Sequence, residues 1–218
     1  MGASIHSSPA VVDGTVYVGS NNGYIYALDA VKGDKQWKFK TGNKVTSSPT
    51  VVDGTVYVGS NDNHLYALNP DTGKMQWTFQ TQGNVTSSPA VIDGTLYIGS
   101  DDTRVYAMDA SIGSQRWTFQ TEGRIWSSPV VVGATVHIGS NDNNVYALNA
   151  EDGTQQWTFE TNDIVTSSPT IVRGTMYIGS HDGRMCALTP ESRTSPYDAE
   201  SANMTETKVF KNTTDGSQ

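Results

Sequence analysis

The chain has 218 residues, a formal net charge of −8 and a single cysteine, Cys186. The acidic balance argues against nucleic-acid binding, which requires a stripe of basic side chains, and one cysteine cannot form an intrachain disulfide. No run approaches the roughly 18 apolar residues of a membrane-spanning helix, and the first residues lack the charged and apolar start of a signal peptide. We therefore expect no nucleic-acid partner, no membrane span and no signal peptide in the chain as given.

The sequence repeats itself every 40 residues. A fixed period of this length is typical of propellers and solenoids, in which each unit buries its apolar face only by stacking on its neighbours. Ser-Ser-Pro recurs at 7–9, 47–49, 87–89, 127–129 and 167–169. Because the repeat leaves no obvious second domain, we expect one domain over residues 1–190.

Each repeat predicts four antiparallel strands. Residues 47–52 form a short β-branched run that ends at Asp53-Gly54, a strong hairpin signal, and residues 55–60 return. Residues 65–68 predict a third strand, and residues 75–81 alternate apolar and polar side chains as a half-buried fourth strand should. No segment has a helical period. Four strands per repeat favour a propeller blade, with the Ser-Ser-Pro strand innermost and the tryptophan strand outermost.

The fifth copy departs from the pattern. It keeps Ser167-Ser168-Pro169 and Gly179-Ser180 but has no tryptophan at the equivalent place. Residues 191–218 are polar and predict either a disordered tail or one irregular outer strand from residues 207–211. The sequence thus predicts an all-β propeller of about five four-stranded antiparallel blades, the fifth incomplete. We expect a compact five-bladed arrangement, with an open arc that self-associates through its blade edges as the alternative.

Four tryptophans recur in register with the repeat. Burying an indole between neighbouring blades removes roughly 150–250 Å² from water, so a structural role is favoured for all four. These tryptophans are Trp37, Trp77, Trp117 and Trp157.

The segment from Ala27 to Trp37 resembles the tryptophan-docking motif of the pyrroloquinoline-quinone (PQQ) repeat, Ala-x-Asp-x-x-Thr-Gly-x-x-x-Trp. Four copies in register cover nearly the whole repeat region, and their docking glycines are Gly33, Gly73, Gly113 and Gly153. The resemblance implies a quinoprotein alcohol dehydrogenase-like β-propeller, usually of seven or eight blades. It also implies a periplasmic or extracellular location for a parent protein.

The dehydrogenases of this family bind the quinone in a central funnel, with a calcium ion, an aspartate base and often a vicinal disulfide. The single cysteine rules out the vicinal disulfide, and the inner strands carry hydroxyls rather than carboxylates. We therefore expect no catalytic residue, no metal site and no cofactor. PQQ binding remains the alternative, with Trp126 as the candidate because it replaces a threonine before Ser-Ser-Pro at the lip of the funnel. An indole there would stack on a planar ligand or plug the pore.

The turns after the second strand and the links into the next inner strand are expected to share one face of the disc. Variable side chains there predict a polar docking surface, although Asn/Asp pairs also simply make hairpin turns. The candidates are Tyr24, Lys44, His64, Arg104, Arg124, Trp126, Asn144, His181 and Arg184. The leading hypothesis is a non-catalytic scaffold that binds a protein or peptide, as the resemblance implies for the propeller subunit of the bacterial barrel-assembly machinery. The alternatives are a quinoprotein fragment that retains PQQ or small-ligand binding, and a repeat array without a selected partner.

Overall fold

The computed structural model describes residues 2–190 and the backbone of a strand at 204–211. Twenty strands form five four-stranded antiparallel sheets, and the described residues contain no helix. In particular, no helix among them is long and apolar enough to cross a membrane. The prediction of an all-β propeller built from four-stranded blades is confirmed.

The blades follow one another in chain order. The first consists of β1 (Ala10–Val12), β2 (Thr15–Ser20), β3 (Tyr24–Asp29) and β4 (Lys35–Lys40). The second consists of β5 (Thr50–Val52), β6 (Thr55–Ser60), β7 (His64–Leu68) and β8 (Met75–Gln80). The third consists of β9 (Ala90–Ile92), β10 (Thr95–Gly99), β11 (Arg104–Asp109) and β12 (Gln115–Gln120). The fourth consists of β13 (Val130–Val132), β14 (Thr135–Gly139), β15 (Asn144–Asn149) and β16 (Gln155–Glu160). The fifth consists of β17 (Thr170–Val172), β18 (Thr175–Gly179), β19 (Arg184–Pro190) and β20 (Met204–Lys211).

The tail supplies the fourth strand of the fifth blade. β20 pairs antiparallel with β19, so this blade has the same strand order as the others. This is the outer-strand alternative that the sequence left open for part of the tail, and β20 begins three residues before the segment 207–211. The rest of the tail, 191–203 and 212–218, lies outside the described residues.

Local turn chemistry sets the strand pairing. Asp13 and Gly14 both have positive φ, 47° and 74°, as the two central residues of a type I′ hairpin turn require. This turn places Val12 opposite Thr15, which fixes the register of β1 on β2. Further out, a register shift after Ala27 leaves Trp37 directly opposite Ala27. The same shift recurs in every blade and directs each tryptophan to the same blade surface.

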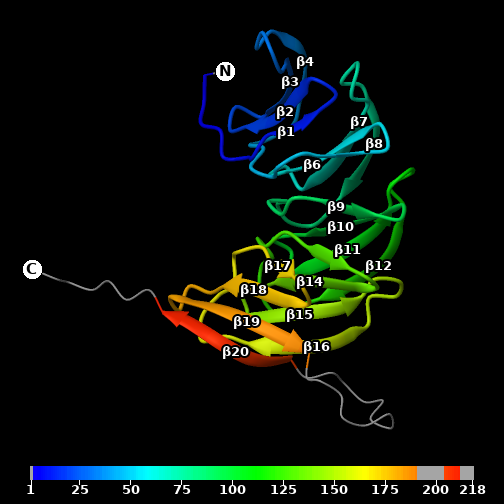
Figure 1. The fold of residues 1–218 in the computed structure, drawn as a ribbon. Coiled ribbons are helices and arrows are strands. Elements are labelled where there is room, and N and C mark those ends of the chain that lie inside the picture. Colours follow the sequence, from blue (N-terminus) through cyan, green and yellow to red (C-terminus); the bar gives the residue numbers. More distant parts are fainter. Residues whose placement is uncertain (1, 191–203, 212–218) are drawn as a thin grey trace, which may run out of the picture.

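The blades are arranged along an arc. Figure 1 shows them following one another from the blue first blade to the orange and red fifth, and each inner strand contacts the inner strand of the next blade. One apolar cluster fills each of the four junctions between consecutive blades. Within the described residues no such cluster joins the fifth blade to the first. The expectation of a compact five-bladed arrangement is therefore wrong, and the described blades form the open arc that was its alternative.

The tryptophans join the blades. The indole N–H of Trp37 donates to the carbonyl of Pro70 at 2.6 Å, and the ring lies against Gly73, where an added Cβ would approach it to 2.6 Å. This docking glycine therefore accepts the indole of the preceding blade. Trp77 lies in the same way on Gly113, and Trp117 on Gly153. Trp157 is buried within the cluster between the fourth and fifth blades.

His137 departs from the repeat tyrosine and makes stability depend on pH. Its ring is buried beside Trp157, with centroids 5.5 Å apart, and Nδ1 has no partner among the described residues. Burial lowers the pKa of His137 to about 4. Since the unfolded histidine titrates near 6.5, it binds more protons than the folded one between these values, so stability falls as the pH drops through this window.

We expect the variant His137→Tyr to lose this part of the acid sensitivity. Between pH 7 and about pH 4, His137 should cost the protein on the order of 2–3 kcal/mol that the tyrosine variant retains. Urea unfolding of both proteins at the two pH values measures the difference. Equal losses on acidification would show that His137 is not buried as a neutral ring.

Candidate functional site

The two faces of the arc differ in chemistry. One, which we call the turn face, is formed by the turns after each second strand, such as residues 21–23, and by the links into the inner strands, such as residues 41–46. The structure brings these two kinds of segment together, because the amide of Asn61 donates to the carbonyl of Lys44 at 2.9 Å and the contact recurs in later blades. The opposite face, which we call the hairpin face, carries the hairpin turns, such as Asp13-Gly14, and the links between third and fourth strands, such as residues 30–34.

Aspartates on the turn face link neighbouring blades. The Oδ2 atom of Asp102 accepts a hydrogen bond from the amide of Gln82 in the preceding link at 2.8 Å and another from the Tyr106 hydroxyl at 2.8 Å. Burial and this carboxylate raise the pKa of Tyr106 to about 12. Asp62, Asp142 and Asp182 accept equivalent backbone hydrogen bonds. Sequence reasoning missed this role, although the recurrence of aspartate at one turn position was its signal.

Five of the predicted surface residues begin the third strands, and several turn back onto their own blade. The ring of Tyr24 lies beneath the ammonium groups of Lys38 and Lys40, with Nζ atoms 4.6 and 4.4 Å from its centroid. His64 stacks on Tyr66. Nε of Arg104 donates to the side chain of Gln120, and the side-chain amide of Asn144 donates to the carbonyl of Asp142. The fifth member is Arg184, whose backbone amide donates to Asp182.

The other four predicted residues lie nearer the inner strands. His181 contacts the Thr166 hydroxyl through Nε2 at 2.9 Å, and Lys44, Arg124 and Trp126 lie on the links. The structure therefore separates the nine candidates into two groups instead of gathering them into one cluster.

Trp126 bridges the third and fourth blades. Its indole is 41 % exposed, and Nε1 donates to Oδ1 of Asp101 at 2.8 Å. Asp101 also accepts a hydrogen bond from the side-chain amide of Asn84 at 3.1 Å. Burial raises the pKa of Asp101, while the hydrogen bond from Trp126 and the charge of Arg124 oppose the shift. The indole is thus held in place with part of its surface open to solvent.

The hydrogen bond from Trp126 to the preceding blade changes the hydrogen bonds of the groups around it. In the second blade the hydroxyl of Thr46 donates to Oδ1 of Asn61 at 3.0 Å, within one blade. The equivalent groups beside Trp126, the Thr86 hydroxyl and Oδ1 of Asn141, are buried without a hydrogen-bond partner in the structure. The indole N–H of Trp126 donates to Oδ1 of Asp101, the atom that would otherwise accept a hydrogen bond from the Thr86 hydroxyl.

The inner strands do not fit the calcium ion of the family's cofactor site. Their serine hydroxyls are used for structure: Ser47 Oγ accepts from the Gly59 amide within its own blade at 3.1 Å, and Ser48 Oγ accepts from the Ser8 amide of the first blade at 2.8 Å. A calcium ion takes six to eight oxygen ligands, with carboxylates prominent among them. Among the described residues no group of three or more His, Cys, Asp or Glu side chains is placed to hold a metal ion. The donor set for the family's cofactor site is missing from the described part of the funnel.

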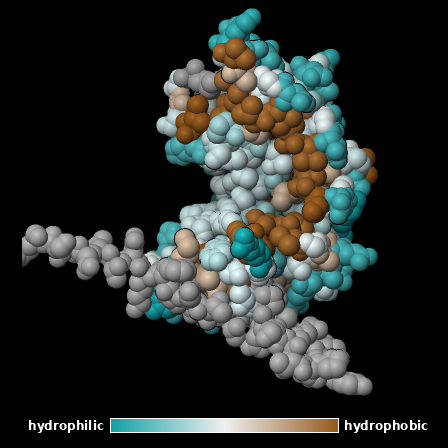
Figure 2. Space-filling view, in the orientation of Figure 1, coloured by the Kyte–Doolittle hydropathy of each residue, from teal (hydrophilic) through white to brown (hydrophobic). Residues whose placement is uncertain are grey.

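The hairpin face carries exposed apolar side chains at a repeated position. Each inner strand ends in valine or isoleucine, and four of the five side chains are exposed: Val12 (36 %), Ile92 (37 %), Val132 (48 %) and Val172 (51 %). We call these four residues the apolar row. Figure 2 shows a curved apolar band that follows the blades beside a paler hollow. Sequence reasoning assigned these residues to strands and did not recognise them as a surface.

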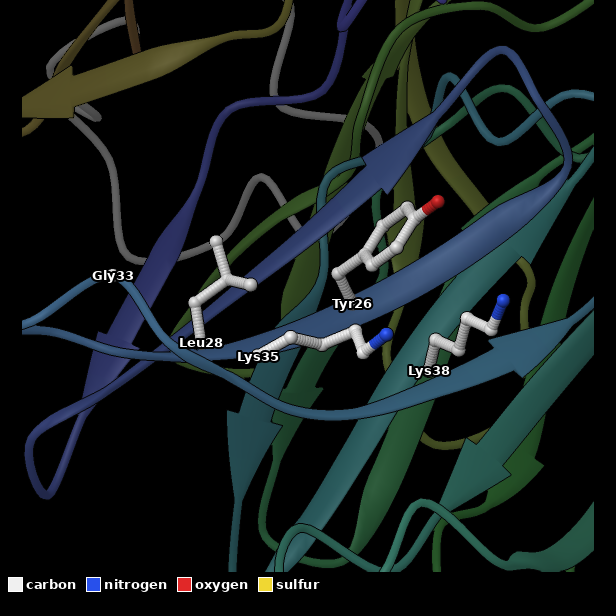
Figure 3. Close-up of a pocket in the computed structure, with 5 residues that line it drawn as sticks. All are labelled: Tyr26, Leu28, Gly33, Lys35 and Lys38. Carbon is white, nitrogen blue, oxygen red and sulfur yellow. The ribbon is translucent and has the colours of Figure 1, made fainter. Parts of the chain in front are cut away.

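A pocket of 360 Å³ opens on the surface of the first blade that no other blade covers. Figure 3 shows it between β3 and β4, with the side chains of Tyr26 and Leu28 beside those of Lys35 and Lys38. Gly33 completes the lining, and an added Cβ there would meet no atom within 4 Å. The pocket is the position at which a docking glycine of the other blades accepts an indole.

Comparison with known protein families identifies the family of the chain. The profile of a family described as outer membrane protein assembly factor BamB matches residues 1–91 and 81–194. The chain belongs to the BamB-like family of PQQ-repeat proteins. A search of curated proteins found no match to this BamB-like chain.

Solved structures agree on the fold. BamB from Moraxella catarrhalis superimposes with a TM-score of 0.76 at 21 % identity, over 86 % of this chain and 62 % of BamB. Quinohemoprotein alcohol dehydrogenase from Comamonas testosteroni gives 0.77 at 18 % identity, over 96 % of this chain and 43 % of the enzyme. The computationally designed protein Ika8 gives 0.74 at 15 % identity, over 82 % and 56 %. This BamB-like chain therefore shares a PQQ-repeat propeller fold and spans less than two thirds of these proteins.

Proposed function

We propose that this BamB-like chain is a non-catalytic scaffold that binds a protein or peptide through the hairpin face. The apolar row carries the proposal. Contiguous exposed apolar surface on a soluble domain marks an interaction site more often than chance, because each uncovered side chain forgoes the free energy of burial. The family description, which names an assembly factor for other proteins, supports a protein partner.

The geometry of the row suits an extended or ridged partner surface. The side chains occur in four of the five blades, on inner strands that contact one another, so the row follows the curvature of the scaffold. Val31 and Ile112 on the same face are 92 % and 67 % exposed and widen the apolar surface at its outer side. The turn face, by contrast, is mainly polar, and its aspartates are engaged in joining the blades. Binding energy is therefore expected from the hairpin face.

Replacing Val132 with lysine tests the proposal. We expect Val132→Lys to reduce capture of the partner by about tenfold or more, because a charge at the centre of an apolar contact is desolvated without a partner. The measurement is affinity capture from the source cells with quantitative mass spectrometry. Gln82→Lys, which adds the same charge on an exposed link of the turn face, should capture as the unmodified protein does. Equal loss in both variants, or in neither, would contradict binding through the hairpin face.

A second candidate function is binding of a planar ligand, such as PQQ, by the exposed indole of Trp126. The held orientation of the ring and its 41 % exposed surface favour it. Titration of the quinone against tryptophan fluorescence separates the candidates: the scaffold proposal expects the same response from the unmodified chain and from Trp126→Ala. Quenching that disappears in Trp126→Ala would establish the ligand site. Oxidation of alcohols or sugars with added quinone and calcium would overturn the non-catalytic proposal.

A further inference from the structure

The two ends of the arc expose complementary copies of one interface. On the first blade Val11 is 61 % exposed, and Val16 and Leu28 are half-buried. Their counterparts in the second blade, Val56 and Leu68, have no exposed surface because the first blade covers them. The first blade thus presents the surface that accepts a preceding blade.

The fifth blade presents the opposite surface. Met185 is 48 % exposed, although the residues at its position in the other blades are completely buried against the next blade. Those residues are Ile25, Leu65, Val105 and Val145. Tyr177 is half-buried, whereas the equivalent Tyr97 is 2 % exposed and donates its hydroxyl hydrogen to Ala150 of the following blade.

We propose that the fifth blade of one copy docks head to tail on the first blade of a second copy, repeating the junction that joins blades within the chain. The proposal is independent of the function of the hairpin face. Because the contact joins two different surfaces, each added copy leaves one end of the assembly free.

A slot at Gly179 identifies one contact of the second copy. Inside the chain, Gly59 faces Val85 of the next link so closely that an added Cβ would lie 2.5 Å from its Cγ1 atom. Gly179 has only atoms of its own blade near it, the closest at 3.6 Å. The residue equivalent to Val85 at the start of the chain is Ile5, which is 47 % exposed. Ile5 of a second copy therefore fits the slot at Gly179.

A ladder of hydrogen bonds along the inner strands extends across the same contact. The amide of each second serine in Ser-Ser-Pro donates to the hydroxyl of the next one, from Ser8 to Ser48 at 2.8 Å through to Ser128 and Ser168 at 2.9 Å. At the ends of the ladder lie the Ser8 hydroxyl and the Ser168 amide. The repeat brings these two groups together when the fifth blade of one copy meets the first blade of another.

Curvature favours a second copy over closure within one chain. The four junctions contain residues with no exposed surface, such as Val45, Leu65 and Val145, so their angles cannot change without disrupting close packing. The arc also superimposes on BamB with a TM-score of 0.76 over 86 % of this chain and 62 % of BamB, so the five blades match part of a longer propeller chain. The two end blades of the described arc are held apart, and the proposal pairs each with the opposite end blade of a second copy.

The contact differs from the internal junctions in one respect. In β20, Lys208 occupies the register position opposite Ala187 that a tryptophan occupies in the other four blades. The pocket at Gly33 therefore receives no indole from a second copy, and we expect the association to be reversible. Lys208→Trp supplies the missing indole and should tighten self-association by about tenfold or more.

Sedimentation across a range of concentrations tests the proposal on the full chain. The unmodified protein should form dimers and larger species as its concentration rises. Val11→Asp blocks the first-blade end and Met185→Asp blocks the fifth-blade end, so each variant alone should remain monomeric. Mixed together they should form a one-to-one dimer through their two intact ends. Met75→Asp, at an exposed position on the outer strand β8 of the second blade and away from both ends, should assemble as the unmodified protein does.

Several outcomes would overturn the proposal. A monomer at all concentrations would show that the ends do not associate, and dimers of either aspartate variant alone would show that another surface does. A mixture of the two variants that stays monomeric would contradict the pairing of one end with the other. Unchanged association of Lys208→Trp would show that the contact does not repeat the internal junction.

Discussion

Replacing Trp117 with alanine is expected to lower the free energy of unfolding by about 3–5 kcal/mol. The indole is 8 % exposed, fills the junction between the third and fourth blades and donates to the Ala150 carbonyl at 3.0 Å. Truncation removes this apolar contact, leaves a cavity against Gly153 and removes one of the two hydrogen bonds that the Ala150 carbonyl accepts, the other coming from the Tyr97 hydroxyl. For a chain of this size the loss corresponds to a fall in melting temperature of roughly 10 °C.

Trp126→Ala is the matched control for this loss. Its indole is 41 % exposed and makes one hydrogen bond to an aspartate, so its removal should cost about 1 kcal/mol or less. Urea unfolding of both variants measures the contrast. Similar losses from the two would mean that the repeat tryptophans do not join the blades.

Gly113→Ala is the second substitution with a large expected loss of stability. Gly33→Ala is its control, because it separates the cost of the backbone conformation from the cost of the clash with an indole. Both glycines have nearly the same left-handed φ, 72° and 73°, so an alanine at either costs about 1–2 kcal/mol in the backbone alone. At Gly113 the added Cβ would also lie 2.5 Å from Cε3 of Trp77, whereas at Gly33 it meets nothing within 4 Å. Gly113→Ala should therefore lose about 1–3 kcal/mol more than Gly33→Ala through overpacking.

Chemical denaturation of the two glycine variants gives the difference directly. If they lose equal stability, the indole of Trp77 does not rest on Gly113. The pair also bears on the pocket of the first blade, because a small loss at Gly33 is expected only while no indole occupies it.

The sequence was sufficient for those parts of the fold that depend on local chemistry. The Asp-Gly turns, the alternation in the tryptophan strands and the 40-residue period predict the four strands of each blade because strand pairing is set by turns and side-chain period. The arc was not predictable in this way. Whether five blades close depends on small angles summed over four junctions, and no short pattern encodes such a sum.

The candidate sites show the same limit. The sequence singled out Trp126, but its bond to Asp101 in another blade follows from contacts that only the folded chain brings together. The apolar row was visible in the sequence as strand residues such as Val132 and Val172, whose position near the end of a short inner strand leaves them uncovered. Burial, which decides between core and surface, is a property of the packed blades.

Photo-crosslinking from residue 132 tests binding through the hairpin face most directly. A photoreactive amino acid at this position, introduced in the source cells, should yield a discrete adduct with one partner protein. The same probe at residue 158, which is exposed on the outer strand β16, should yield none. No adduct from residue 132, or the same adducts from both positions, would contradict the proposed scaffold function.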